Sequence, residues 1–173
     1  MFPTLRRTAL AVAVVLPAAL LGGCSLIDSG GSCGGSGAAR KDLAAQKVLS
    51  SPPDGATAPA NYRGVGVSTG CDDDSPGPAW LHADRVYTFP GTRRAVFDHY
   101  ARTAAAQGWH SGPAPRAGAA CWTRTDAGRH LVLNVDFQLD AWSPAPDPGK
   151  GIGYEVTVGS NADGGRAGVS CTD

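Results

Sequence analysis

Three groups of residues in this 173-residue chain have side chains that could do chemistry: a serine between glycines, four histidines and a run of aspartates. Ser68 lies in the segment GVSTG (residues 66–70), a G-x-S-x-G spacing that can expose a nucleophilic serine on a sharp turn. That turn must join a strand to a helix, but residues 71–78 are rich in aspartate, proline and glycine and cannot begin a helix. We therefore interpret the pattern as a coincidence within a glycine-rich strand. A small secreted hydrolase that uses Ser68 or a His/Asp pair remains the alternative hypothesis.

The histidines and the aspartates lack the spacing of a metal site. An EF-hand loop takes cation ligands from alternate positions, whereas Asp72, Asp73 and Asp74 are adjacent and do not converge on one ion. No two histidines have a spacing such as H-x-x-x-H; they are His82, His99, His110 and His130. We expect solvated turn carboxylates and ordinary surface histidines, and we predict neither a bound metal nor another cofactor.

The tryptophans allow two interpretations; they are Trp80, Trp109, Trp122 and Trp142. The simpler one is that they fill the core of a small domain. The other is that Trp122 and Trp142 form an exposed aromatic patch for a glycan, a peptide or a partner protein. Trp122 and Arg124 share one face of a segment that we predict below to be a strand. Trp142 lies just beyond the fourth of these predicted strands. Trp122 and Trp142 are therefore the candidate binding patch.

The chain begins with the pattern of a secretory signal. Arg6 and Arg7 are followed by an uncharged run, residues 9–21, as in the charged and apolar regions of such a signal. The run is too short for a membrane-spanning helix, which needs about 20 apolar residues, and Pro17 interrupts it. The arginine pair also raises twin-arginine export, but the residues that usually follow such a pair are missing. We predict a signal peptide over residues 1–23 and prefer Sec-type export, with the route left open.

The segment Leu21-Gly22-Gly23-Cys24 resembles the lipobox of bacterial lipoproteins. The resemblance implies that the Cys24 thiol carries a diacylglyceryl group and that a signal peptidase cuts before Cys24. Two or three acyl chains such as palmitate anchor a protein stably, whereas one chain binds only marginally. We therefore expect a membrane-anchored protein on the extracytoplasmic side of the cell membrane.

Charge and composition exclude several classes of function. The chain balances 15 Lys and Arg against 15 Asp and Glu, so it has no basic excess with which to bind nucleic acid. Removal of residues 1–23 takes away two arginines and no acid, which leaves a formal charge of −2. With 24 glycines and 13 prolines the chain is still short of low-complexity composition, and its length indicates one domain.

Hydrophobic periodicity predicts the fold of the mature chain. Residues 24–39 are rich in glycine and serine and read as a lipidated flexible tether, and residues 40–60 as a short helix and loop. Within residues 61–173, period-two alternation marks about five strands, and one apolar stripe marks a helix over residues 93–107 with Thr92 as N-cap. These elements predict a two-layer α+β domain: an antiparallel sheet covered on one face by one main helix, followed by a glycine-rich tail.

Residues of the predicted helix also carry a second resemblance. The segments Asp98-His99-Tyr100-Ala101 and Gln107-Gly108-Trp109, followed by a hairpin that contains a cysteine, resemble those of small actinobacterial lipoproteins of unknown function. The resemblance covers residues 60–173. It implies a fold and a location in the cell envelope, and no activity.

Four cysteines besides Cys24 are expected to form disulfides, because export favours oxidation. If the first two strands form a hairpin, the helix returns the chain to the end of the sheet where Cys71 lies, and Cys121 opens the next strand there. This geometry predicts Cys71–Cys121 and leaves Cys33 for Cys171. The sequence as a whole predicts a non-catalytic envelope lipoprotein that acts by binding a protein or glycan partner, or as a structural component.

Overall fold

The computed structural model describes residues 33–73, 77–113, 117–140, 142–166 and 171. The predicted signal peptide, the lipobox with Cys24 and most of the predicted tether lie outside the described residues. Among the helices that the structure describes, none is long and apolar enough to cross a membrane.

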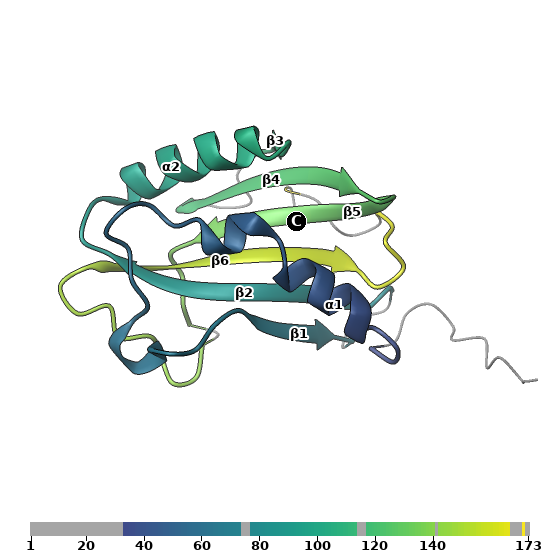
Figure 1. The fold of residues 1–173 in the computed structure, drawn as a ribbon, viewed down its shortest axis with the longest axis horizontal. Helices are drawn as coiled ribbons and strands as arrows, with labels where there is room; N and C mark the ends of the chain where they lie inside the picture. The colour runs from purple at the N-terminus through teal and green to yellow at the C-terminus, as the bar shows by residue number, and fades with distance from the viewer. Residues whose placement is uncertain (1–32, 74–76, 114–116, 141, 167–170, 172–173) are drawn as a thin grey trace, which may run out of the picture.

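One antiparallel sheet of six strands forms the body of the protein, in the order β1-β2-β6-β5-β4-β3 (Figure 1). The strands are β1 (Ser68–Asp72), β2 (Trp80–Phe89), β3 (His110–Ser111), β4 (Ala119–Asp126), β5 (Arg129–Asp136) and β6 (Ile152–Asn161). The α+β class with an antiparallel sheet is therefore confirmed. The additional strand is β3, which pairs two residues with β4 at one edge and is too short to show periodicity.

The predicted helix is confirmed as α2 (Arg93–Ala106), which ends one residue before the predicted bound, and Thr92 is its N-cap as predicted. The side chain of Thr92 accepts a hydrogen bond from the Ala95 N–H, which caps the first turn. At the other end Gly108 adopts a φ of +78°, and the Trp109 N–H donates to the Ala104 carbonyl at 3.0 Å. This Schellman geometry folds the Trp109 side chain back into the core.

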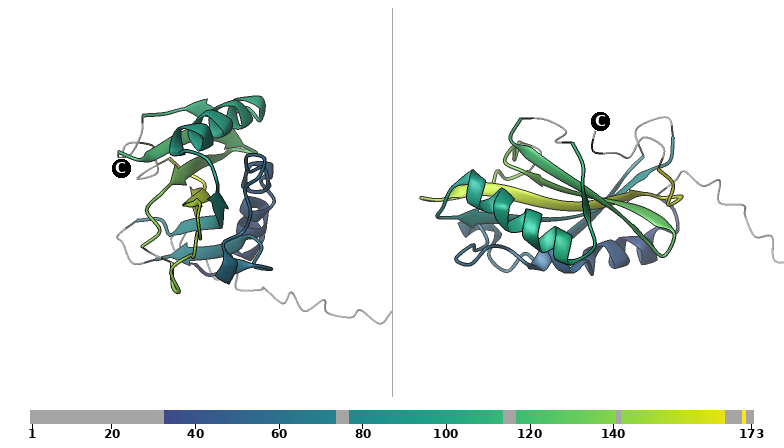
Figure 2. Two further views of the ribbon diagram at one scale, coloured as in Figure 1. Left: turned by 90° about the vertical axis from the view of Figure 1, so that its left-hand side faces the viewer. Right: turned by 90° about the horizontal axis from the view of Figure 1, so that it is seen from above.

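A second helix, α1 (Gly37–Ala44), begins inside the segment predicted as tether and is followed by a 3-10 turn, η1 (Lys47–Ser50). Leu43, Val48 and Leu49 of these two elements are buried. They lie on the same side of the sheet as α2, so both helices cover one face (Figure 2). The apolar side of α1 is almost Leu43 alone, which explains why the sequence pattern there is weak.

The core lies between the helices and one face of the sheet. Aromatic rings dominate its centre: Tyr87 of β2 stacks on Tyr154 of β6 at 5.5 Å between ring centroids, and Tyr100 of α2 meets Tyr154 edge-on. Burial raises the pKa of all three phenols, so they stay neutral at physiological pH. Aliphatic side chains of the three central strands complete the core: Leu81, Ala83, Leu131, Leu133, Val135, Val156 and Val158.

All four cysteines are in disulfides as predicted, but the predicted pairing Cys71–Cys121 and Cys33–Cys171 is wrong. The structure joins Cys33 to Cys71 and Cys121 to Cys171. The hairpin of β1 and β2 does form, but α2 then carries the chain across the sheet and β6 returns between β2 and β5. β1 and β4 are thus four strand spacings apart, about 19 Å, whereas disulfide α-carbons lie within about 7 Å.

Candidate functional site

Polar side chains gather on the sheet face opposite α1 and α2, which we call the polar face. Because side chains alternate along a strand, residues paired across neighbouring strands share a face. Ser68 of β1 is paired with Asp84 of β2, and Gly70 is paired with His82. Glu155 of the next strand, β6, is on the same face. The register therefore brings a serine, a histidine and two carboxylates from three strands to one region.

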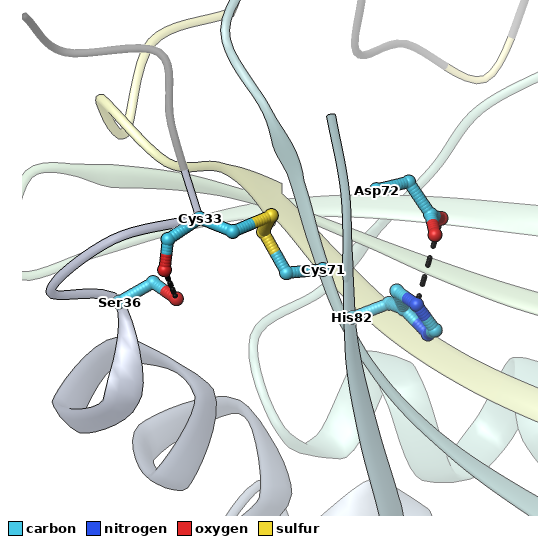
Figure 3. Close-up of a disulfide and its surroundings, with 5 residues drawn as sticks. All are labelled: Cys33, Ser36, Cys71, Asp72 and His82. Carbon is cyan, nitrogen blue, oxygen red and sulfur yellow. Dashed lines mark hydrogen bonds and ion pairs between the residues drawn. A yellow bond between two sulfur atoms is a disulfide. The ribbon is translucent and has the colours of Figure 1, made fainter. Parts of the chain in front are cut away.

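His82 is held between two carboxylates. Its Nδ1 donates a hydrogen bond to Asp84 Oδ2. On the other side of the ring, its Nε2 lies 3.5 Å from Asp72 Oδ2 (Figure 3). The Asp84 side chain is nine-tenths buried, whereas that of Asp72 is mostly exposed. The hydrogen bond to Asp84 is the largest cause that raises the pKa of His82; burial opposes it, and the charges of Asp84, Asp72 and Glu155 raise the pKa further. The cluster therefore favours the imidazolium form.

Strand β1 supports this cluster through its alternation. A Cβ at Gly70 would collide with the imidazole of His82, so the ring needs glycine beneath it. The next residue, Cys71, faces the helices and is bonded to Cys33. Figure 3 shows the disulfide on one side of the strands and the Asp72–His82 pair on the other. The same short strand therefore carries one wall of the polar site and the attachment point of the N-terminal segment.

Trp142 is fixed beside the cluster by two contacts. Its indole N–H donates to Glu155 Oε1 at 2.9 Å, and its ring meets Tyr62 edge-on at 5.3 Å between centroids. The Tyr62 hydroxyl in turn donates to the Pro144 carbonyl at 2.6 Å, which ties the segment after β5 to the 3-10 turn η2 (Ala60–Tyr62). These contacts hold the indole in place, although Trp142 lies in the loop between β5 and β6.

These side chains line a shallow pocket of about 280 Å³ on the polar face. Its six lining residues are Ser68, Thr69, His82, Asp84, Trp142 and Glu155. The volume is at the low end for a small-molecule site and suits a single side chain or a compact small molecule.

Ser68 is in the pocket, but it is not set up as a nucleophile. It begins strand β1 and is not on a strand-to-helix turn, as the sequence argument expected. Its hydroxyl donates to the backbone carbonyl of Asp84 at 3.3 Å, while the Nε2 atom of His82 faces Asp72. The hydrolase hypothesis specified Ser68 but left its His/Asp pair open. The structure places one such pair, His82–Asp84, in the pocket of Ser68, and the described residues form no serine–histidine hydrogen bond there.

The predicted aromatic patch is not formed as expected. Trp122 has only 5% of its surface exposed and packs in the core beneath the helices, because its face of β4 is the core face. Trp142 is on the polar face and lines the pocket. The two tryptophans therefore cannot act together in binding.

Two of the four histidines, His82 and His130, are not the ordinary surface residues that the sequence predicts. Of the other two, His110 is exposed, and His99 donates from Nε2 to the Ser51 carbonyl at 2.7 Å. His82 is in the pocket, and His130 is buried because the chain after β6 returns beside β5, where Gly164 accepts from the His130 N–H. Among the residues that the structure describes, no three His, Cys, Asp or Glu side chains are placed to hold a metal ion.

Three residues of the pocket were not singled out from the sequence: Thr69, Asp84 and Glu155. Glu155 and Asp84 have ordinary spacing, and only His82-Ala83-Asp84 carries a local signal: two polar residues two apart in a strand point to the same face. The contact between Trp142 and Glu155 joins a loop to a strand and has no local signature.

Comparisons of the chain with protein-family models, with curated proteins and with solved structures return no match.

Proposed function

We propose that this protein is a lipid-anchored binding module on the extracytoplasmic side of the cell membrane, and that its ligand site is the polar-face pocket. The export signal and the lipobox at Cys24 support the location. The observation that carries the binding role is the convergence of two fixed pairs, His82–Asp84 and Trp142–Glu155, around one cavity. Such pre-organised polar groups beside an aromatic ring are typical of a small-ligand site.

The geometry favours binding over catalysis. Ser68 is the nucleophile of the hydrolase hypothesis. Its hydroxyl donates to a backbone carbonyl and not to a general base. General-base activation of a serine requires a direct hydrogen bond to the base or one water between them.

The Cys33–Cys71 disulfide limits how far the pocket can be from the membrane. Cys24 precedes Cys33 by nine residues. This segment spans at most about 30 Å when fully extended, and about 16 Å as a root-mean-square distance if it behaves as a flexible glycine-rich chain. Because Cys33 is bonded to the strand that lines the pocket, the ligand must be available within a few nanometres of the membrane surface.

Fractionation of cells that express a Cys24→Ser variant tests the anchor. We expect the variant to leave the membrane fraction and to appear in the soluble or secreted fraction, because the acylated thiol is lost. A Cys33→Ser/Cys71→Ser variant is the matched control and should stay in the membrane fraction. Retention of Cys24→Ser at the membrane after normal signal processing would contradict the lipoprotein proposal.

Saturation-transfer NMR with the full-length protein in detergent tests the pocket. The compounds to be screened are small amines, amino acids, monosaccharides and carboxylic acids. We expect at least one class to bind, and its signal to be lost in Trp142→Ala and retained in Val65→Ala, which changes an exposed side chain outside the pocket. If no compound distinguishes these two variants, and both are folded by circular dichroism, the pocket is not the binding site.

The hydrolase alternative has its own test, because Ser68 and the His82–Asp84 pair line the same pocket. We expect Ser68→Ala to leave any cellular phenotype of the protein unchanged. Loss of the phenotype, with the fold and ligand binding to the pocket both intact, would favour the hydrolase over the binding module.

A further inference from the structure

We propose that the polar-face pocket recognises a primary ammonium group, either on a free amine or on a lysine side chain. This inference rests on the proposed function, since it names the chemical class of the ligand for the same site. It follows from the charges around the pocket, from one carboxylate oxygen that accepts no hydrogen bond from the described residues, and from the indole wall.

The charges around the pocket are mainly negative. Among the six lining residues His82 is the only basic side chain, and the carboxylates of Asp84 and Glu155 line the pocket with it. The Asp72 carboxylate adds a third negative charge 3.5 Å from His82. Even when His82 is protonated, acidic groups are therefore in excess, which disfavours an anionic ligand.

Asp84 supplies the specific acceptor. Its Oδ2 atom takes the hydrogen bond from His82, and its Oδ1 atom has no hydrogen-bond partner among the residues that the structure describes. The side chain is nine-tenths buried and lines the pocket. Oδ1 is therefore open to a ligand, and one that brings an N–H or O–H group to it gains a charge-assisted hydrogen bond.

Trp142 supplies the aromatic wall. Its only polar atom donates to Glu155, so the indole offers the pocket its ring and not a hydrogen-bonding group. A cation over an indole face gains about 0.5–2 kcal/mol, depending on how well it is desolvated. A carboxylate next to an indole is thus suited to an alkylammonium group.

Hydrogen-bonding capacity separates an amine from a neutral sugar. A sugar hydroxyl both donates and accepts, whereas an ammonium group has three donors and no acceptor. The pocket is rich in acceptors, and the hydroxyl of Ser68 already donates to the Asp84 backbone carbonyl. This surplus of acceptors matches an ammonium group better than a neutral polyol.

Titrations of the full-length, ¹⁵N-labelled protein in detergent test the inference. The indole N–H signal of Trp142 is assigned by its loss in Trp142→Phe, and the probes are 1,5-diaminopentane, Nα-acetyl-lysine methylamide and the neutral isostere 1,5-pentanediol. We expect saturable shifts of this signal with the amines, and binding of the diol weaker by about tenfold or more, the loss of one charge-assisted hydrogen bond. Similar affinity for both amines indicates a lysine side chain as the natural source, and binding of the diamine alone indicates a free amine.

Three variants separate the pocket charge from nonspecific attraction. We expect Asp84→Asn to weaken amine binding by about tenfold, and the exposed Asp72→Asn to weaken it by about two- to threefold, an effect that salt removes. Asp98→Asn, which changes an exposed aspartate on α2, should have no effect. Because Asp72 is mostly exposed, its substitution keeps the test valid even if Asp84→Asn unfolds the protein.

A pair of sugars distinguishes failure of this inference from failure of the proposed function. Glucosamine carries an ammonium group and N-acetylglucosamine does not. If N-acetylglucosamine, or the diol, shifts the Trp142 signal as strongly as the amines, the pocket binds a neutral ligand, and the ammonium inference is wrong while the binding role stands. If none of the probes and no compound of the wider screen shifts it, both proposals fail.

Discussion

Removal of the Cys121–Cys171 disulfide should destabilise the protein more than removal of Cys33–Cys71, although the two close loops of similar length. Their sequence separations are 50 and 38 residues. In the chain-entropy model each disulfide then contributes about 4 kcal/mol to the free energy of unfolding, and the two contributions differ by only a few tenths of a kcal/mol. Loop closure alone therefore predicts nearly equal effects.

The difference comes from burial in the folded state. Cys121 and Cys171 are 2% and 3% exposed and pack with Val132 on the polar face. Serine hydroxyls at these positions lose water without an assured partner, which costs about 1–3 kcal/mol more. Cys33 and Cys71 are only partly buried, so serines there stay hydrated.

Urea denaturation of four double variants, followed by far-ultraviolet circular dichroism, measures both contributions. We expect Cys33→Ala/Cys71→Ala and Cys33→Ser/Cys71→Ser to lose about 4 kcal/mol alike, a fall in Tm of about 8–16 °C. For Cys121 and Cys171 the serine variant should be less stable than the alanine variant. Equal stability of those two variants would refute the burial argument, and a Cys71–Cys121 linkage in peptide maps of the oxidised native protein would refute the strand order.

Two further predictions concern the polar face. Gly159→Ala should destabilise the protein by about 1–3 kcal/mol in the same urea assay, because its Cβ would collide with the Trp80 ring, whereas Gly37→Ala in α1 has open space and should be neutral or stabilising. The pKa of His82 is raised above 6.5 by folding, so its bond to Asp84 stabilises the protein fully below that pH and less as pH rises through the folded-state pKa. The stability advantage of the native protein over His82→Gln should therefore shrink as the pH rises above 6.5, and an advantage that grows with pH would contradict the assigned bond.

Local patterns predicted the elements of this fold well where each element has its own signal. Helix α2 is capped by Thr92 and buries one apolar stripe, as the sequence predicts. Gly108, at a φ of +78°, ends the helix. The glycine-rich segment around residues 66–70, interpreted from the sequence as a strand, is strand β1 only from Ser68 onward, and Gly64 adopts a φ of +81° in the turn before it. Two valines that alternate with glycines are too weak a pattern to fix where a strand begins.

The order of the strands could not be predicted, and the disulfide error follows from it. Period-two alternation tells which side chains share a face, but not which strands are neighbours. Consecutive strands are often adjacent, and that default would keep β2 near β4. Here β6, the last strand, pairs with both β2 and β5, so it separates Cys71 from Cys121.

The candidate site was predictable only in part for the same reason. His82 and Asp84 lie two apart in one strand, so the sequence alone places them side by side. Their meeting with Ser68 depends on the β1–β2 register, and the approach of Trp142 to Glu155 depends on the path of the loop after β5. Contacts between elements are decided by tertiary packing, which no single segment encodes.

Strand β1 connects the proposed lipid anchor to the pocket, and this connection has a testable consequence. Among the described strands, β1 is at an edge of the sheet and pairs with β2 alone, and the Cys33–Cys71 bond ties it covalently to the segment before α1. Edge elements with few contacts open at a lower free energy than central strands. In Cys33→Ala/Cys71→Ala we therefore expect the amide hydrogens of β1 to exchange faster than in the native protein, by a larger factor than those of β6 at the centre of the sheet. Because Ser68 and Thr69 of β1 line the pocket, amine binding should weaken in the same variant. The global loss of stability speeds exchange in both strands, so an equal factor for β1 and β6 would show that the disulfide acts only through global stability and not on the pocket wall.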